Sequence, residues 1–249
     1  MIKIEEIRML VINNLDKHYK GTDKGVTDIS LHVEAGDIYA FIGHNGAGKT
    51  TLLKAITGIH EFDKGEVLID GIDLKKDPVE VKRRIAYIPD NPDIYEFLTG
   101  IQYLQMIADI FRVPAADRES IISDYADRFE ITGSLGDLVS SYSHGMKQKL
   151  VIISALLHKP KLLIMDEPFV GLDPKAAFIL KEIMKEMTAE GCAIFFSTHV
   201  LEVAEKLCNK VAIIRDGRII ANGRMEDVVK EGASLEELFM ETVTTGDEK

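Results

Sequence analysis

The sequence has no tryptophan, only two cysteines, and fewer basic than acidic residues. Cys192 and Cys208 are far apart, form no CxxC pair, and have no histidine cluster beside them. This pattern argues against a disulfide framework or a zinc site. It is typical of two reduced, buried thiols in a cytosolic protein.

Positively charged residues are outnumbered. The sequence has 30 Lys and Arg and 41 Asp and Glu, which gives a formal net charge of −11. A surface this acidic does not suit a protein that grips phosphate backbones over a wide area. We therefore expect no nucleic acid among the partners. One compact anion site remains compatible with this charge, because backbone amides and a single lysine act locally.

Long apolar runs are also missing. The most apolar run, Leu150 to Leu157, is interrupted by Ser154, whereas a membrane helix needs roughly twenty residues. The opening residues, MIKIEEIRML, have no apolar signal core. With 249 residues and 46% hydrophobic content, the sequence predicts a folded globular protein of one to two domains, without a targeting segment or membrane span.

Secondary-structure patterns change along the chain. Short β-rich segments come first, at Ile2–Ile4, Met9–Leu15, Ile29–Val33 and Tyr39–Ile42. Helical periodicity dominates residues 91–157, after which apolar strands alternate with helices. This alternation predicts a mostly parallel sheet. We expect an α/β core formed by residues 1–89 and 158–249, with a β-subdomain and a short C-terminal tail, and an inserted helical subdomain at 90–157.

A phosphate-binding motif stands between a strand and a helix start. Residues 43–50 read GHNGAGKT and fit G-x-x-x-x-G-K-[ST]. The glycines let backbone N–H groups turn toward phosphate oxygens, and the helix N-terminus favours anions. Lys49 is expected on the β- and γ-phosphates, and Thr50 on Mg²⁺. The expected triphosphate-binding residues of this segment are Gly43, His44, Asn45, Gly46, Ala47, Gly48, Lys49, Thr50 and Thr51.

Two further strand ends carry polar residues. Asp166 and Glu167 end an apolar strand, so Asp166 is a candidate metal ligand and Glu167 a candidate for polarising an attacking water. Ser197-Thr198-His199 ends the next buried strand. In parallel sheets, ligands bind at the carboxyl ends of the strands, so these ends should meet at one site. His199 is then placed to contact the γ-phosphate.

These motifs resemble the nucleotide-binding subunit of ATP-binding cassette (ABC) transporters over nearly the whole chain. Residues 43–50 match Walker A, Asp166 and Glu167 end Walker B, and His199 matches the switch histidine. The resemblance implies an α/β P-loop NTPase fold with an N-terminal antiparallel β-subdomain. It also implies that Tyr19 stacks on adenine, and that ATP and Mg²⁺ are the cofactors.

The family signature Leu-Ser-Gly-Gly-Gln is degenerate here. Residues 142–146 read YSHGM, which keeps Ser143 and Gly145 as candidate ATP contacts. This form resembles exporter-type members with separately encoded membrane subunits. A second departure is Asp90, which follows Tyr87-Ile88-Pro89 where the family usually has glutamine. Asp90 is a candidate Mg²⁺ ligand through water, although an ionised carboxylate cannot donate a hydrogen bond.

The resemblance implies an ATP hydrolase that dimerises head to tail, with itself or a homologous cassette, around two ATP. It would power a membrane transporter, an exporter by preference, from the cytoplasmic face of the cell membrane by contact with integral membrane subunits. The alternative is a soluble single-cassette ABC-type ATPase in macromolecular assembly. A P-loop kinase or GTPase is disfavoured by the Ser143–Gly145 element and by the absence of a guanine-reading Asn-Lys-x-Asp.

Overall fold

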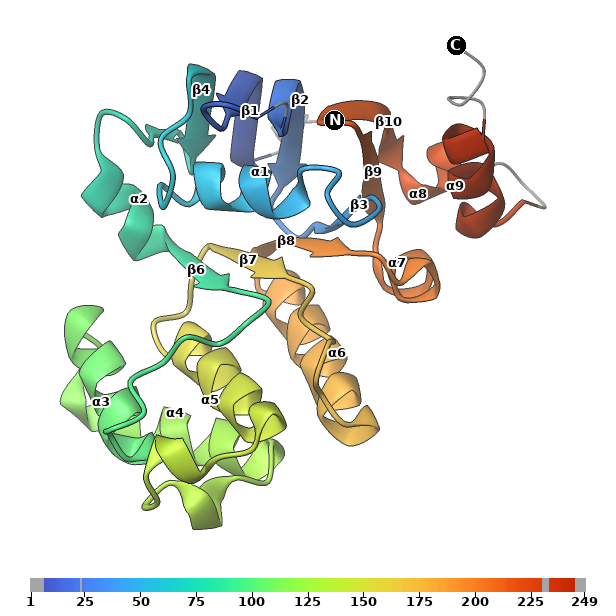
Figure 1. Ribbon diagram of the computed structural model, residues 1–249. Coiled ribbons are helices and arrows are strands. Elements are labelled where there is room, and N and C mark those ends of the chain that lie inside the picture. The colour runs from blue at the N-terminus through green and yellow to red at the C-terminus, as the bar shows by residue number, and fades with distance from the viewer. Residues whose placement is uncertain (1–6, 23, 230–232, 245–249) are drawn as a thin grey trace, which may run out of the picture.

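The computed structural model describes residues 7–22, 24–229 and 233–244, and places two β-sheets and their helices along one chain (Figure 1). The strand expected at Ile2–Ile4 lies outside the described residues. The strands expected from Met9, Ile29 and Tyr39 onward are present, and all three are longer than the sequence pattern indicates, the third by one residue.

An antiparallel four-stranded sheet is built mostly from the N-terminal part of the chain. Its order is β2-β1-β4-β5, with the bounds Arg8–His18 for β1, Gly25–Glu34 for β2, Lys64–Ile69 for β4 and Ile72–Asp73 for β5. Buried and exposed residues alternate along β2, which is the period expected for a sheet with one covered face. The sheet therefore presents one apolar face to the rest of the protein.

The second sheet has six strands in the order β10-β9-β3-β8-β7-β6. Their bounds are Ile38–Ile42 for β3, Ile85–Ile88 for β6, Leu162–Asp166 for β7, Ala193–Thr198 for β8, Lys210–Arg215 for β9 and Arg218–Arg224 for β10. Only β10, which forms a hairpin with β9, runs antiparallel to its neighbour. Strands β3, β7 and β8 are buried along their full length, as parallel strands covered on both faces are.

The helices divide between the two faces of this sheet and a separate group. Helix α1 (Lys49–Ile56) packs between the two sheets, and α6 (Pro174–Ala189) covers the opposite face of the large sheet (Figure 1). The remaining helices are α2 (Pro78–Arg84), α3 (Gly100–Ile110), α4 (Ala115–Arg128), α5 (His144–Leu156), α7 (Leu201–Leu207), α8 (Met225–Val228) and α9 (Leu235–Thr244), with 3₁₀ turns at Thr132–Ser134 and Val139–Ser141. Helices α3, α4 and α5 form one group beside β6 (Figure 1). Throughout the described ranges, every helix falls short of the length and apolarity needed to cross a bilayer.

Two apolar cores follow from the alternation along β3. Tyr39 and Phe41 point into the core that α1 and the antiparallel sheet share, whereas Ile38, Ala40 and Ile42 point into the core under α5 and α6. Burial of large side chains on both faces stabilises the central strands and fixes the positions of their ends relative to one another. The carboxyl ends of these strands therefore provide a rigid edge.

The register of the parallel strands brings the expected site residues to this edge. Ile42, the last residue of β3, is opposite Thr198 at the end of β8, and Asp166 at the end of β7 is opposite Ser197. Strand β6 ends beside β7, with Ile88 opposite Met165. The residues that follow β3, β8, β7 and β6 therefore lie at the same edge of the sheet, as expected for a parallel α/β sheet.

Candidate functional site

The loop between β3 and α1 is folded tightly enough to require glycine. A Cβ on Gly43 would lie 2.6 Å from the carbonyl oxygen of Ile214, and Gly48 has a φ of 110° at the N-cap of α1. Both positions exclude larger residues, the first by contact and the second by backbone conformation. The loop consequently leaves the first N–H groups of α1 without side-chain caps, which is the arrangement that binds anions.

Lys49 is folded back over this loop. Its Nζ donates hydrogen bonds to the carbonyl oxygens of Gly43 at 2.8 Å and His44 at 3.4 Å, and lies 3.4 Å from Glu167 Oε1. Only 7% of the lysine side chain is exposed. A buried ammonium group needs such partners because water no longer solvates it. The cation is therefore held directly above the loop where phosphate would bind.

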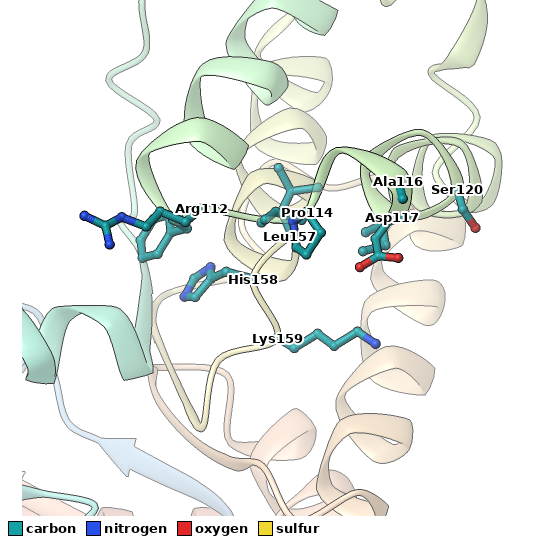
Figure 2. A pocket seen from close by; sticks show the side chains of 11 residues that line it. Arg112, Pro114, Ala116, Asp117, Ser120, Leu157, His158 and Lys159 are labelled. Atoms are coloured by element: carbon teal, nitrogen blue, oxygen red, sulfur yellow. The ribbon is translucent and has the colours of Figure 1, made fainter.

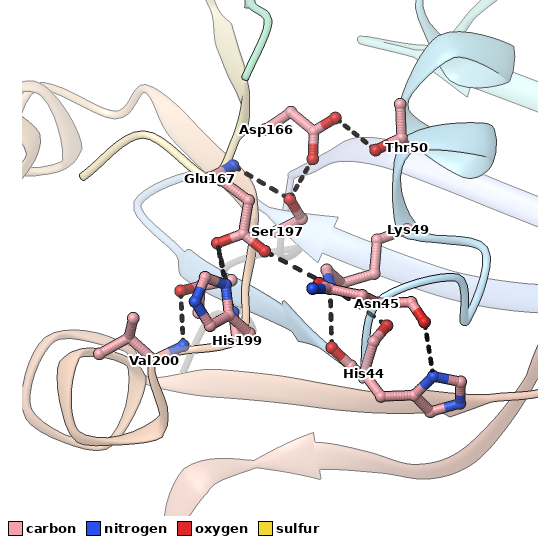
Figure 3. Close-up of polar contacts among 11 residues, drawn as sticks. His44, Asn45, Lys49, Thr50, Asp166, Glu167, Ser197, His199 and Val200 are labelled. Atoms are coloured by element: carbon pink, nitrogen blue, oxygen red, sulfur yellow. Dashed lines mark hydrogen bonds and ion pairs between the residues drawn. The ribbon is translucent and has the colours of Figure 1, made fainter. Parts of the chain in front are cut away.

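Asp166 links the phosphate loop to the sheet edge. Its Oδ2 accepts a hydrogen bond from Thr50 Oγ1 at 2.6 Å, and its Oδ1 accepts one from Ser197 Oγ at 2.5 Å (Figure 3). Asp166 is 1% exposed. The hydroxyl and the carboxylate that the sequence assigns to Mg²⁺ thus already lie side by side.

Glu167 occupies the centre of the site (Figure 3). Its backbone has a φ of 48°, a left-handed conformation that is uncommon for a non-glycine residue, and its N–H donates to Ser197 Oγ at 3.2 Å. The carboxylate reaches Lys49 through Oε1, while Oε2 lies 2.9 Å from His199 Nδ1 and accepts from the His199 N–H at 3.3 Å. Glu167 therefore joins the phosphate-loop lysine to the histidine of the neighbouring strand.

A cavity of about 230 Å³ opens between these groups. It is lined by Tyr19, Lys24, Gly25, Asn45, Gly46, Gly48, Lys49, Thr50, Thr51, Asp90, Asp166 and Glu167. The lining joins residues from both sheets and from the phosphate loop. A cavity lined by a buried lysine and by carboxylates suits a triphosphate together with a divalent cation.

Asp90 adds a third carboxyl group to this cavity, beside Asp166 and Glu167. Burial raises the pKa of the Asp90 carboxyl, and the negative charges of Asp166 and Glu167 raise it further, while His144 and His199 lower it. The extra acid thus lies in a strongly anionic environment. Such an environment favours a bound cation.

Three comparisons with known proteins agree with this geometry. The sequence model of a family described as ABC transporter matches residues 26–170, more than half of the chain. The chain belongs to the ABC transporter family. The ABC transporter ATP-binding protein NatA of Bacillus subtilis is 33% identical over 226 residues, which cover 90% of this chain and 92% of that protein.

Two further relatives of this ABC protein extend the comparison. SkfE of Bacillus subtilis, described as a SkfA peptide export ATP-binding protein, is 33% identical over 214 residues and covers 86% of this chain and 88% of its own. The solved structure of an ATP-binding subunit of an ABC transporter is 37% identical, with a TM-score of 0.90 over 94% of this chain and 99% of the other. The chain is accordingly an ATP-binding cassette that hydrolyses ATP and powers transport.

Several expected ABC residues lie outside the cavity lining. The side chain of His44 is exposed, with Nδ1 2.9 Å from the carbonyl oxygen of Asn45. Ala47 is buried, and its carbonyl accepts a hydrogen bond from Gly217 N–H at 3.0 Å. Gly43 packs closely against Ile214 of β9. The side chains of His44 and Ala47 therefore take no part in the cavity lining.

The signature residues of this cassette lie at the start of α5, away from their own cavity. Ser143 caps the helix, since its hydroxyl accepts a hydrogen bond from Met146 N–H at 3.3 Å. A Cβ on Gly145 would lie 3.1 Å from the carbonyl oxygen of Gly171, and a Cβ on Gly171 would lie 2.7 Å from the ring of His144. The signature therefore packs against the loop after β7 in the same chain.

Residues without a predicted role also contribute. The sequence pattern places Ser197 only at a strand end near the site, and in the structure its hydroxyl donates to Asp166 Oδ1 and accepts from the Glu167 N–H. Lys24 and Gly25 line the cavity, although no motif marks them. Another cavity, about 670 Å³ and lined in part by Arg112, His158 and Lys159 (Figure 2), shares no lining residue with the cavity around Lys49.

Proposed function

We propose that this cassette binds Mg-ATP in the cavity around Lys49, forms a head-to-tail dimer that completes each site, and drives an exporter. One observation carries the proposal: the phosphate-loop lysine, the Thr50–Asp166 pair and Glu167 line one cavity, and His199, outside that lining, contacts Glu167. The residue roles, the dimer, the direction of transport and the partners below belong to this proposal.

The residues present fit a magnesium ion. Thr50 and Asp166 offer hard oxygen ligands that already touch at 2.6 Å, and Asp90 lines the same cavity. Among the residues that the structure describes, no three acidic, histidine or cysteine side chains are grouped as a metal cage. Mg²⁺ suits such a site because it usually keeps several waters and binds one or two carboxylates together with substrate phosphates. When bound, the ion supplies charge neutralisation to the triphosphate.

The chemistry of hydrolysis falls to Glu167 and His199. Glu167 would take the proton of the attacking water through its carboxylate, and His199 fixes the orientation of that carboxylate through its Nδ1 and backbone N–H. The phosphate loop from Gly43 to Thr51 holds the triphosphate by its N–H groups, and Tyr19 receives the base. Phosphoryl transfer depends on positioning and charge, which these fixed contacts provide.

A second copy of the chain, or a homologous cassette, completes the site in the proposed dimer. Ser143 and Gly145 do not line the cavity of their own chain, yet Ser143 is exposed at the start of α5, and the first N–H groups of a helix favour an anion. In a head-to-tail dimer the two residues of one chain face the triphosphate of the other. The fold is also shared with an ATP-binding cassette, 20% identical, that is described as a dimer bound to ADP and Pi.

An apolar groove favours a membrane partner. About 390 Å³ in volume, it lies between β6 and α3, and its lining includes Ile59, Ile94, Ile107 and Phe111. Ile59 is 53% exposed, so an apolar partner in the groove would bury it. We assign the groove to a cytoplasmic helix of an integral membrane subunit, gripped between the core (1–89 and 158–249) and the helical subdomain (90–157). The chain would then be peripheral on the inner face of the membrane, and the naming of SkfE supports export.

Two measurements test the proposal. The purified chain should hydrolyse ATP in the presence of Mg²⁺, and Lys49→Ala should remove this activity. In cells that express the chain with its neighbouring genes, the parent should fractionate with membranes, and Ile59→Asp should release it without loss of ATP binding. A parent chain that remains in the supernatant would favour a soluble assembly ATPase instead.

A further inference from the structure

Tyr19 is held in place by a histidine that belongs to no motif. The Tyr19 hydroxyl lies 3.1 Å from His60 Nδ1, and the two rings meet edge to face, with centroids 5.9 Å apart and planes at 87°. Lys17 Nζ lies 5.6 Å from the centre of the tyrosine ring. Because Tyr19 lines the ATP cavity, these contacts fix the angle of an aromatic side chain at the site.

His60 is itself anchored to the far end of α1. Its backbone N–H donates to the carbonyl oxygen of Lys54 at 2.9 Å, in the last turn of the helix whose first residue is Lys49. Nearby, Asp63 joins the same loop to β1, since its N–H donates to Asp16 and its carboxylate accepts from His18 N–H at 2.7 Å. The phosphate loop and the tyrosine are thus tied to opposite ends of one short, rigid helix.

The protonation state of His60 suits this contact. Burial lowers the pKa of the His60 imidazole, and the nearby ammonium groups of Lys54 and Lys17 lower it further. A neutral ring at pH 7 leaves Nδ1 free to accept the tyrosine O–H when Nε2 carries the proton. The lone pair and the hydroxyl then match as acceptor and donor.

We infer that His60 is a positioning residue for the nucleotide base, acting through Tyr19. This inference rests on the proposed function, in which the Tyr19 ring receives the base. A ring fixed before the nucleotide arrives avoids the cost of ordering it, which for a mobile side chain is about 0.5–1.5 kcal/mol. His60→Ala should therefore weaken nucleotide binding by about two- to tenfold.

Titration calorimetry with two ligands separates this role from a general loss of structure. ADP carries the base, and inorganic pyrophosphate does not, and neither is consumed during the measurement. His60→Ala and Tyr19→Phe should each weaken ADP binding to a similar extent and leave pyrophosphate binding unchanged. The double variant should be no worse than either single variant, because both remove the same hydrogen bond.

The conservative variant and a distant control sharpen the test. His60→Asn places an amide acceptor the same number of bonds from the backbone as Nδ1 and should restore most of the ADP affinity. His32→Ala removes a half-exposed histidine from the antiparallel sheet, outside the cavity lining, and should change neither ligand. The inference is overturned if His60→Ala binds ADP like the parent, if pyrophosphate weakens equally, or if His60→Asn fails to recover. Failure of the parent itself to bind ADP would overturn the proposed function instead.

Discussion

Replacing Glu167 by glutamine separates binding from chemistry in this cassette. The amide keeps the volume of the side chain and removes its negative charge. In the structure that charge faces Lys49 Nζ at 3.4 Å and His199 Nδ1 at 2.9 Å, and only 12% of the side chain is exposed. The substitution should therefore act on a group held by two defined contacts.

The two effects have opposite signs. At an effective dielectric constant of about 20, the attraction across 3.4 Å is about 5 kcal/mol before desolvation is subtracted. Exposed ion pairs retain about 1 kcal/mol after side-chain ordering, and in a buried pair desolvation likewise offsets most of the Coulombic attraction. ATP competes with Glu167 for Lys49, so the variant should bind ATP up to about fivefold more tightly. Loss of the proton acceptor should slow hydrolysis by at least about a hundredfold.

Equilibrium binding of ATP and single-turnover hydrolysis test these effects separately. The parent and Glu167→Gln should differ strongly in turnover and weakly, in the favourable direction, in affinity. Size-exclusion chromatography with ATP should show a dimer of the variant. Near-parental hydrolysis would refute the role of Glu167 as base and point to His199, while loss of ATP binding would show that Glu167 is a metal or structural residue.

The remaining predictions concern other parts of the site. Lys49→Ala should reduce hydrolysis by about a hundredfold or more in a protein that still folds, because the ammonium group contacts developing charge; a normal rate would contradict the phosphate-loop assignment. Ser143→Arg should bind nucleotide normally as a single chain but lose hydrolysis, measured by steady-state turnover; full activity would contradict the dimer. Asp90→Asn should need more Mg²⁺ for half-maximal ATP binding in a metal titration; an unchanged titration would remove Asp90 from the metal site. Gly171→Ala should lower the free energy of unfolding by about 1 kcal/mol or more, measured by chemical denaturation, because its φ is 80° and alanine is strained in that conformation; an unchanged free energy of unfolding would exclude this strain.

Local sequence was sufficient for the phosphate loop and for most strands. The glycine spacing, the apolar strand before Gly43 and the helix start at Lys49 are contiguous, so the pattern and the structure coincide. Strand ends at Asp166 and Ser197 could also be placed together, because parallel strands share one carboxyl edge. The predicted α/β fold is confirmed by the sheet order and by the related ATP-binding subunit.

Contacts between distant segments were not predictable in this way. The pairing of β1 with β2 contains register irregularities near Ile12 and Leu15, which no local periodicity encodes. The contact of Lys49 with Glu167 depends on the left-handed backbone at Glu167, and that of Tyr19 with His60 on how the loop after α1 meets β1. Such geometry is set by packing of the whole core and not by neighbouring residues.

The Lys49–Glu167 contact connects nucleotide binding to the chemical step. A carboxylate that neutralises a buried lysine is only partly available to a water molecule, because one of its oxygens is engaged. Triphosphate offers Lys49 a stronger anionic partner, so its arrival would free Glu167 Oε1, while His199 continues to hold Oε2 at 2.9 Å. The proposed base then becomes competent only where phosphate is bound. The same exchange explains why Glu167→Gln should raise affinity and lower turnover together: the glutamine removes the competitor for Lys49 and the proton acceptor in one change.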